Sequence, residues 1–281
     1  MILSFHPVYE ADRNLLCAGR DPGKDELSAI KSARAVILPQ GCRESLYAMA
    51  RENCRHVFPN YDQRFTFPDK LGQAHLFSRM NAPHPATETF KTAADFKRTY
   101  QSPGAYSKLS YPMVFKFDWG GEGDNVFLVD DINALKIRLS LAESYEKTGQ
   151  YGFLLQEYIP AHGRSLRIVV IHRKFFSYWR RQEDQNEFYT NLKKGATIDT
   201  HNRPQLQKAA IKVTASFCGK TGIDLAGIDL LFSEASLQKG RIEPLLLEIN
   251  YFFGRKGLGG SEAYYKILQE EIDHWVEGIR Q

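Results

Sequence analysis

The sequence has little cysteine and nothing that resembles a cysteine-based site. Its four cysteines, Cys17, Cys42, Cys54 and Cys218, form no C-x-x-C pair, and the eight histidines do not cluster beside them. Structural zinc sites need such clusters, so the sequence argues against one. We interpret the four cysteines as reduced thiols, which are typical of cytosolic proteins.

Long apolar runs are also absent. No run approaches the roughly 20 apolar residues that span a bilayer, and the opening segment, MILSFHPVYEADRN, lacks the pattern of a signal peptide. The formal charge is only +4, and the basic residues do not gather in a patch interleaved with aromatic ones. We therefore expect a cytoplasmic protein that binds neither membrane nor nucleic acid, and we leave open whether it forms a homo-oligomer.

Alternating helix and strand patterns predict how the chain is organised. Up to about residue 66, apolar segments such as AVILP alternate with helical ones such as RESLYAMAREN. This pattern favours a small α/β unit with a parallel sheet. From residue 67 onward a helix, PDKLGQAHLFSRM, precedes a series of strand pairs separated by long helices. We therefore expect a short N-terminal unit, 1–66, followed by a larger region of α+β type, 67–281.

The apolar segment LLLEINYFFG carries two polar side chains, Glu248 and Asn250. Side chains two residues apart on a strand share a face. Folding this strand back on AGIDLLFSE, with a turn near 238–240, places Asp229 roughly opposite Glu248. Opposed carboxylates repel unless a cation lies between them, and carboxylate and amide oxygens suit Mg²⁺. Either these residues hold a metal, or they are solvated groups at a strand end.

A glycine-rich hairpin, PMVFKFDWGGEGDNVFLV, is the second candidate site. Lys116 ends its first strand on the same face as Val114, and the backbone N–H groups of Gly120, Gly121 and Gly123 can approach phosphate oxygens. It is neither a Walker motif nor a dinucleotide fingerprint, because GK[ST] is absent and the loop joins two strands. The alternative is an ordinary turn.

Two further strands end in residues that can bind a nucleotide. Arg180 and Arg181 end one strand, and Asn191 follows ten residues later. Since neighbouring strand residues face opposite sides, only one of these arginines can point into a given cleft. Guanidinium groups bind phosphate well, although a solvated strand end can also carry them. The other strand, FLLQEYIP, either offers its end to an adenine edge or is an ordinary sheet strand.

In this order, the segments resemble the ATP-grasp superfamily. The likeness is strongest to the branch of the ribosomal-protein glutamate ligase (RimK) and glutathione synthetase. It extends from about residue 66 to 275 and rests on LLQEYI, NEFYTNLKKGA and the pair GIDLL and LLLEIN. The resemblance implies an ATP-grasp fold, in which two α+β subdomains, about 67–155 and about 156–281, clasp ATP. A short Rossmann-like α/β unit, 1–66, would precede them.

The resemblance also implies roles for the matching residues. Two lysines would bind the ATP phosphates beneath the glycine loop: Lys70 and Lys116. One strand end would frame adenine with Glu157, Tyr158 and Ile159, and Gln156 before them would also belong to the ATP site. One of the two arginines, with Asn191, would face the γ-phosphate and the acyl-phosphate intermediate. Three residues would hold two Mg²⁺ ions, or Mn²⁺ in their place, with Glu248 bridging them: Asp229, Glu248 and Asn250.

The implied activity is ATP-dependent ligation of a carboxylate to an amine through an acyl phosphate, with release of ADP and phosphate. The substrates would be an amino acid, a small peptide or a protein tail. Two alternatives stay open. One is a phosphotransferase on the same scaffold, which would lack the amine step. The other is a regulatory protein that binds nucleotide without turning it over.

Three features depart from the family pattern. The family's Asp-x-Arg step near the ribose is Ser165-Leu166-Arg167 here, which puts that ribose contact in doubt. Tyr251-Phe252-Phe253 replaces a small residue and a proline, and these rings either pack in the core or wall the acceptor pocket. The N-terminal unit is shorter than usual, so the resemblance transfers no substrate. A further segment, GRKGLGGSE, either binds an anionic substrate at a helix N-terminus or is a flexible turn.

Overall fold

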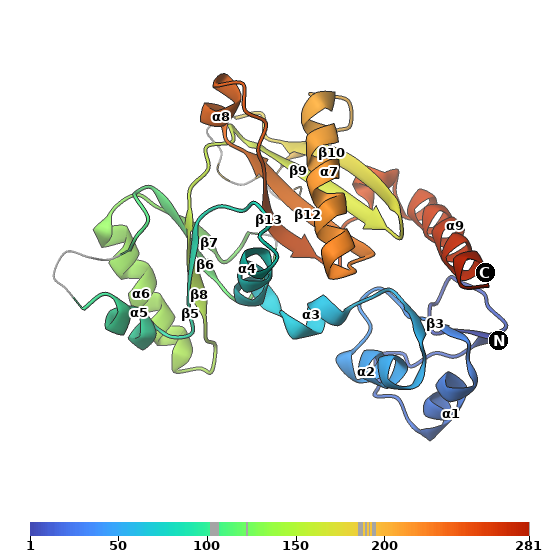
Figure 1. Cartoon of the computed structure of the whole chain (residues 1–281). Helices are drawn as coiled ribbons and strands as arrows, with labels where there is room; N and C mark the ends of the chain where they lie inside the picture. Colours follow the sequence, from blue (N-terminus) through green and yellow to red (C-terminus); the bar gives the residue numbers. More distant parts are fainter. Residues whose placement is uncertain are drawn as a thin grey trace.

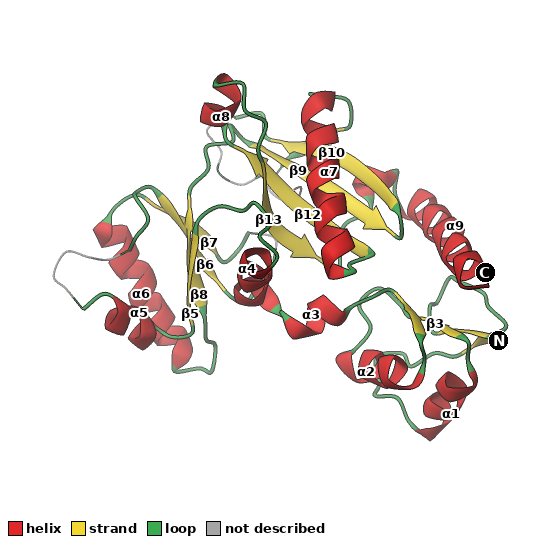
Figure 2. Cartoon of the chain, in the orientation of Figure 1, coloured by secondary structure: helices red, strands yellow, loops and turns green. Residues whose placement is uncertain are grey.

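The computed structural model describes residues 1–101, 107–121, 123–184, 188, 190, 192 and 195–280. Within these residues the strands form three sheets, which Figure 1 shows one after another across the molecule. Helices cover the outer faces of these sheets, as the colouring in Figure 2 makes clear. In the same part of the chain, no helix is both long enough and apolar enough to cross a membrane.

The N-terminal sheet is parallel throughout, with the order β2-β1-β3-β4. Its strands are β1 (Ile2–Ser4), β2 (Arg13–Asn14), β3 (Ala35–Ile37) and β4 (His56–Phe58). On one face pack α1 (Lys24–Ser32) and α2 (Glu44–Asn53). On the other packs α9 (Ser261–Arg280), from the far end of the chain. The predicted parallel α/β unit is confirmed, although the sequence did not predict β2.

The second sheet is antiparallel and has the order β5-β8-β6-β7. Its strands are β5 (Thr87–Phe90), β6 (Met113–Phe117), β7 (Val126–Val129) and β8 (Phe153–Glu157). Alternate side chains such as Phe115 and Phe153 point into a core that α5 (Ala93–Thr99) and α6 (Ile132–Glu146) cover. Because strand side chains alternate, Lys116 and Gln156 lie on the opposite face.

The third sheet is also antiparallel, with the order β11-β10-β9-β12-β13. Its strands are β9 (Arg164–Ile171), β10 (Lys174–Arg181), β11 (Thr197–Asp199), β12 (Leu225–Phe232) and β13 (Pro244–Asn250). Its apolar face packs against α4 (Asp69–Arg79) and α7 (Pro204–Thr221), which ends at the left-handed Gly222. The other face carries Arg167 and Asp229, which lie opposite each other in the pairing of β9 with β12.

The connection between β12 and β13 is longer than the predicted turn. A short helix, α8 (Glu234–Gln238), precedes the turn at Lys239-Gly240. The predicted register is nevertheless confirmed, since Asp229 pairs with Glu248 and a bulge follows Asp229. The bulge lies in the part of this strand pair that carries the candidate metal ligands.

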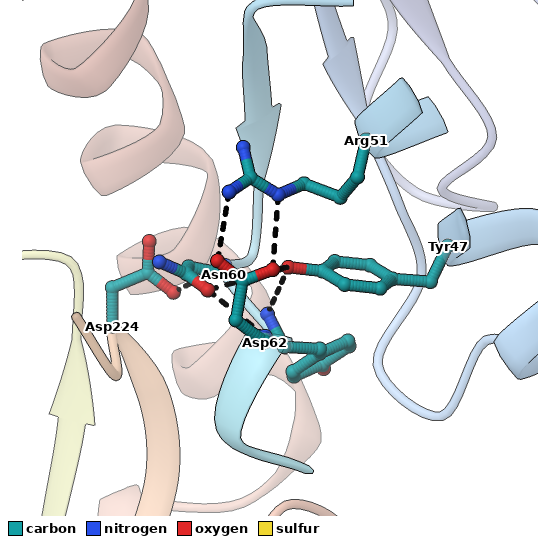
Figure 3. Close-up of polar contacts among 6 residues, drawn as sticks. Tyr47, Arg51, Asn60, Asp62 and Asp224 are labelled. Atoms are coloured by element: carbon teal, nitrogen blue, oxygen red, sulfur yellow. Dashed lines mark hydrogen bonds and ion pairs between the residues drawn. The ribbon is translucent and has the colours of Figure 1, made fainter. Parts of the chain in front are cut away.

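A polar joint attaches the N-terminal unit to the third sheet (Figure 3). Asp224, which precedes β12, accepts a hydrogen bond of 2.8 Å from the backbone N–H of Asn60. Asp62, at the start of α3 (Asp62–Thr66), pairs with Arg51 at 2.7 Å and accepts a hydrogen bond from the Tyr47 hydroxyl at 2.8 Å. The division at residues 66 and 155 stays a prediction, because α9 joins the core of the first sheet to that of the third.

Candidate active site

A cleft lies between the open faces of the second and third sheets, and it gathers most of the predicted site residues. Those that line it are Lys70, Lys116, Gly120, Gly121, Gly123, Gln156, Glu157, Tyr158, Ile159, Arg180, Asp229, Glu248 and Asn250. Arg181 does not line it. Asn191 lies outside the described residues. Segments from five separate parts of the chain therefore meet at one cleft: α4, the glycine hairpin, the end of β8, the end of β10 and the pair of β12 and β13.

Lys116 is held by a neutral amide. Its side chain is buried, and Nζ donates a hydrogen bond of 2.7 Å to Oε1 of Gln156. Nε2 of Gln156 in turn donates to the Thr87 hydroxyl at 3.0 Å. Burial lowers the pKa of Lys116 to about 8, although the nearby Glu248 works against the shift. Because its hydrogen-bond partner is uncharged, the lysine keeps its positive charge available for an anion in the cleft.

Lys70 contacts the glycine hairpin itself. Nζ donates to the backbone carbonyls of Asp118 at 3.3 Å, Trp119 at 3.1 Å and Gly120 at 2.8 Å. Gly120 has a φ of 81°, and a Cβ there would lie 2.4 Å from Nδ2 of Asn125. The glycine is therefore required by both conformation and space. All three ammonium protons of Lys70 fix the loop, so its predicted contact with phosphate stays a prediction.

Two arginines converge on Asp229. Arg167 donates to both carboxylate oxygens, at 2.6 and 2.7 Å, and Nη2 of Arg180 lies 2.9 Å from Oδ2. Burial alone would raise the pKa of Asp229, but the two guanidinium groups outweigh it and lower that pKa. Arg181 points to the other face and pairs with Asp199 at 3.0 Å. The structure thus identifies Arg180 as the arginine of the pair that faces the cleft.

Glu248 and Asn250 present oxygens that no other described residue uses. Glu248 has no hydrogen bond or ion pair with another described residue, although it lies opposite Asp229. Asn250 donates through Nδ2 to Asp229 at 3.2 Å, which leaves its Oδ1 free to accept. Hard oxygen donors of this kind fit Mg²⁺. The described residues hold no group of three or more His, Cys, Asp or Glu placed for a metal, so the candidate ligands are the Glu248 carboxylate and the Asn250 amide oxygen. The predicted role of Asp229 as a third ligand stays a prediction, because both of its oxygens already pair with arginine.

The far end of the cleft is apolar and has a backbone edge. Ile159 is buried there, and the ring of Tyr158 lies 6.0 Å from that of Phe188. Val114 and Leu154 add apolar surface. The Glu157 carboxylate accepts a hydrogen bond from the backbone N–H of Ala86 at 3.2 Å. A planar, uncharged base with hydrogen-bonding edges suits such a surface.

The departures from the family pattern have distinct outcomes. The Ser165 hydroxyl accepts a hydrogen bond from Nε of Arg180 at 3.0 Å, so this side chain orients an arginine. The aromatic run divides in two. Tyr251 packs on Tyr61 in the core, and Phe253 is buried. Phe252 is 72% exposed and lines the cleft. The packing interpretation is therefore right for Tyr251 and Phe253, and a role of Phe252 in an acceptor pocket stays a prediction.

The sequence predictions missed several residues of the cleft, among them Thr87, Arg167 and Tyr178. Arg167 appears only as part of an atypical motif in the sequence. Its pairing with Asp229 depends on β9 lying beside β12, and these strands are separated by about 60 residues. Two strands, β10 and β11, and the helix α7 lie between these strands in the sequence, so no local spacing predicts the contact of Arg167 with Asp229.

Comparison with known proteins supports the same family. The RimK-like ATP-grasp domain matches residues 68–269. A probable alpha-L-glutamate ligase of Aeromonas salmonicida (strain A449) is 29% identical over 205 residues, which are 72% of this chain and 62% of that protein. The chain therefore spans less than two thirds of that relative's length.

Two solved structures share the fold. The RimK domain ATP-grasp protein from Sphaerobacter thermophilus DSM 20745 aligns with a TM-score of 0.62 at 14% identity, over 96% of this chain and 98% of that one. The D-alanine–D-alanine ligase from Bacillus anthracis aligns with a TM-score of 0.59 at 12% identity, over 96% and 86%. At such low identity, these matches establish the arrangement of the sheets and leave the chemistry to the residues of the cleft.

Proposed function

This chain belongs to the RimK-like ATP-grasp family, and we propose that it is an ATP-dependent ligase that joins a carboxylate to an amine. The predicted ATP-grasp fold is thereby confirmed. Membership of an ATP-grasp family implies use of ATP. We propose which residues bind ATP, which residues hold the metal, what the two substrates are and what reaction they undergo.

The observation that carries the proposal is the change in character along the cleft. One end is apolar, at Tyr158 and Ile159, and would take adenine. The middle holds the buried ammonium of Lys116. The other end holds Arg180 and the free carboxylate of Glu248. This order matches base, phosphates and metal in a bound nucleotide, with the γ-phosphate directed toward Arg180.

The chain's own residues would position the reactants. Lys116 would hold the phosphates, and Arg180, oriented by Ser165 and Asp229, would face the transferred phosphoryl group. Glu248 and Asn250 would hold Mg²⁺, which neutralises phosphate charge when bound. The carboxylate oxygen of the first substrate attacks the γ-phosphorus, and ADP leaves. The amine then attacks the acyl carbon, the amide forms, and phosphate leaves with the carboxylate oxygen.

The substrates are proposed from chemistry and from the relative's name. An amino acid, a peptide or a protein tail would supply the carboxylate and the amine. Because the relative is named a probable alpha-L-glutamate ligase, L-glutamate is the first amine to test. A cytoplasmic location and the oligomeric state stay predictions.

The test has two stages. A thermal melt with a non-hydrolysable ATP analogue should shift upward by several degrees, and the shift should need Mg²⁺. ADP release is then measured with MgATP, L-glutamate and a pool of amino acids and short peptides, and products are identified by mass. An amide product supports the ligase. A phosphorylated product with no amide identifies a phosphotransferase. Nucleotide binding without any ADP release identifies a non-catalytic binding protein.

A further inference from the structure

An arginine without an acidic partner lies just beyond the cleft. The guanidinium of Arg255 stacks over the rings of Tyr264, at 4.9 Å, and Tyr265, at 4.4 Å. Its one hydrogen bond to a described residue is a long one, 3.4 Å, to the Ser261 hydroxyl. No described carboxylate pairs with it. Stacking on two rings fixes the plane of a guanidinium while its edge remains able to bind a carboxylate.

His6 supplies an uncharged donor near this arginine, because its ring packs edge-on against Tyr265, on which Arg255 stacks, with 6.4 Å between the ring centroids. Its Nδ1 accepts a hydrogen bond from the backbone N–H of Val8 at 3.3 Å, so the neutral ring carries its proton on Nε2. Burial, helped by the charge of Arg255, lowers the pKa of His6 to about 4. The imidazole therefore stays neutral at physiological pH. Together the two side chains carry a single positive charge, which matches one carboxylate.

The loop that carries Arg255 borders the arginine end of the cleft. A Cβ on Gly257, in the 3₁₀ helix η2 (Lys256–Leu258), would lie 2.2 Å from the ring of Tyr178, which lines the cleft. A Cβ on Gly227 would lie 3.0 Å from Phe253 and 3.3 Å from Arg167. The neighbouring Gly254 also lines the cleft. The loop thus meets the cleft where the phosphoryl group would be transferred, far from the adenine end.

The N-terminal unit fixes this loop. Oε1 of Gln40 accepts a hydrogen bond from the Tyr264 hydroxyl at 3.2 Å, and its Nε2 donates to the carbonyl of Tyr251 at 3.2 Å. Gln40 and His6 both follow the carboxyl ends of parallel strands, β3 and β1, where open α/β sheets bind ligands. Residues at the carboxyl edge of the N-terminal sheet therefore hold the Tyr264 ring, on which Arg255 stacks. A substrate would bind at this same edge.

We propose that Arg255 and His6 bind a carboxylate of the amino acid that brings the amine to the reaction. The inference rests on the proposed ligase function and deepens it by naming the substrate as an amino acid recognised through its carboxylate. Arg255 supplies two N–H donors and the charge, and His6 supplies the Nε2–H. The amino group of the same molecule would then lie toward Tyr178 and Arg167, close to the acyl phosphate.

Calorimetric titration tests this with full-length protein loaded with Mg²⁺ and the ATP analogue. The probes are L-glutamate, its α-carboxamide and its γ-carboxamide. Wild-type protein should bind L-glutamate and should lose about 10- to 100-fold in affinity for whichever amide removes the recognised carboxylate. Arg255→Gln should bind L-glutamate about 10- to 100-fold more weakly, and it should no longer distinguish the acid from that amide.

Two variants make the test specific. Lys256→Gln removes a charge from the same loop and should bind L-glutamate within about twofold of wild type. Arg255→Lys keeps the charge without the planar fork and should retain part of the affinity. The inference is overturned if wild-type protein binds the acid and both amides equally, if it binds no L-glutamate, or if Arg255→Gln binds as wild type does. Loss of the Mg²⁺-dependent nucleotide shift in wild-type protein would instead count against the proposed function.

Discussion

The two walls of the cleft differ in how their charged side chains are paired. On the wall formed by β6 and β8, Lys116 is buried against the neutral amide of Gln156. On the wall formed by β9, β10 and β12, Arg167 and Arg180 share the single carboxylate of Asp229, so these three side chains keep one net positive charge. Glu248 belongs to the second wall by position, yet it resembles Lys116 because no described residue pairs with its charge. The comparison separates charges that hold a wall together from charges that remain for a ligand.

Asp229→Asn should have the largest effect on the fold. The substitution removes the carboxylate that compensates Arg167 and Arg180, both of which are buried. Breaking a buried ion pair from one side costs about 3–5 kcal/mol, because the remaining charge has no partner. Chemical denaturation without ligand measures this loss. Arg181→Gln is the control, since Arg181 pairs with Asp199 at a partly exposed position and should cost at most about 1 kcal/mol.

Glu248→Gln should lower the activity and leave the stability of the fold nearly unchanged. It also removes one carboxylate, but no described residue loses an ion pair, so the free energy of unfolding should change by at most about 0.5 kcal/mol. ADP release with MgATP should fall by about 10²- to 10³-fold, because the free carboxylate is the strongest candidate ligand for the metal. Wild-type turnover in this variant would remove Glu248 from the site, and a large loss of stability would place it among the compensated charges.

The affinity for the ATP analogue should fall as the pH rises through about 8, the pKa of Lys116. Only the ammonium form attracts phosphate, so the affinity should drop by about tenfold between pH 7.5 and 9. Gln156→Glu would give Lys116 an anionic partner. That partner should raise the pKa of Lys116 and move the fall to higher pH, while weakening binding at pH 7 because the charge is compensated.

Titration calorimetry with a fixed excess of Mg²⁺ measures both profiles. Thr87→Val is the control, because it removes the second hydrogen bond of Gln156 and keeps the contact with Lys116. A profile that stays flat from pH 7 to 10 would show that the charge of Lys116 is not used in binding.

The sequence predicted contacts within one hairpin and failed on contacts between distant strands. Asp229 and Glu248 lie on successive strands, so folding the chain back about one turn was enough to place them opposite each other. The choice between Arg180 and Arg181 needed the pairing of β10 with β9 and of β9 with β12. Gln156 was expected in the ATP site because its segment matches a motif, but that motif could not predict the bond of its side chain to Lys116 across the pairing of β6 with β8.

Missed elements have local causes. The strand β5 follows Pro83 and Pro85, which are typical of a loop, and it forms because β8 offers an edge for pairing. The two-residue strand β2 is too short to leave a pattern in the sequence. In each case tertiary pairing decides the conformation, and no window of neighbouring residues contains that information.

The joint at Asp224 is a third setting for charge, and its predicted effect is on stability alone. Asp224 is partly buried away from the cleft, accepts a hydrogen bond from Asn60, and has no described cationic partner. Burial raises its pKa to about 7 from an ordinary value of 3.8. A carboxyl group with a raised pKa binds its proton more tightly in the folded state, so wild-type stability should decline as the pH rises from about 4 to 7.

Asp224→Asn keeps an oxygen that can accept the Asn60 hydrogen bond and removes the charge. The variant should therefore be more stable than wild type at pH 8, and the advantage should vanish at about pH 4. Parallel melts of both proteins at the two pH values measure the difference. If the variant is instead less stable at pH 8, the ionised carboxylate strengthens the joint. An unpaired buried charge would then stabilise this protein even where no ligand is present to use it.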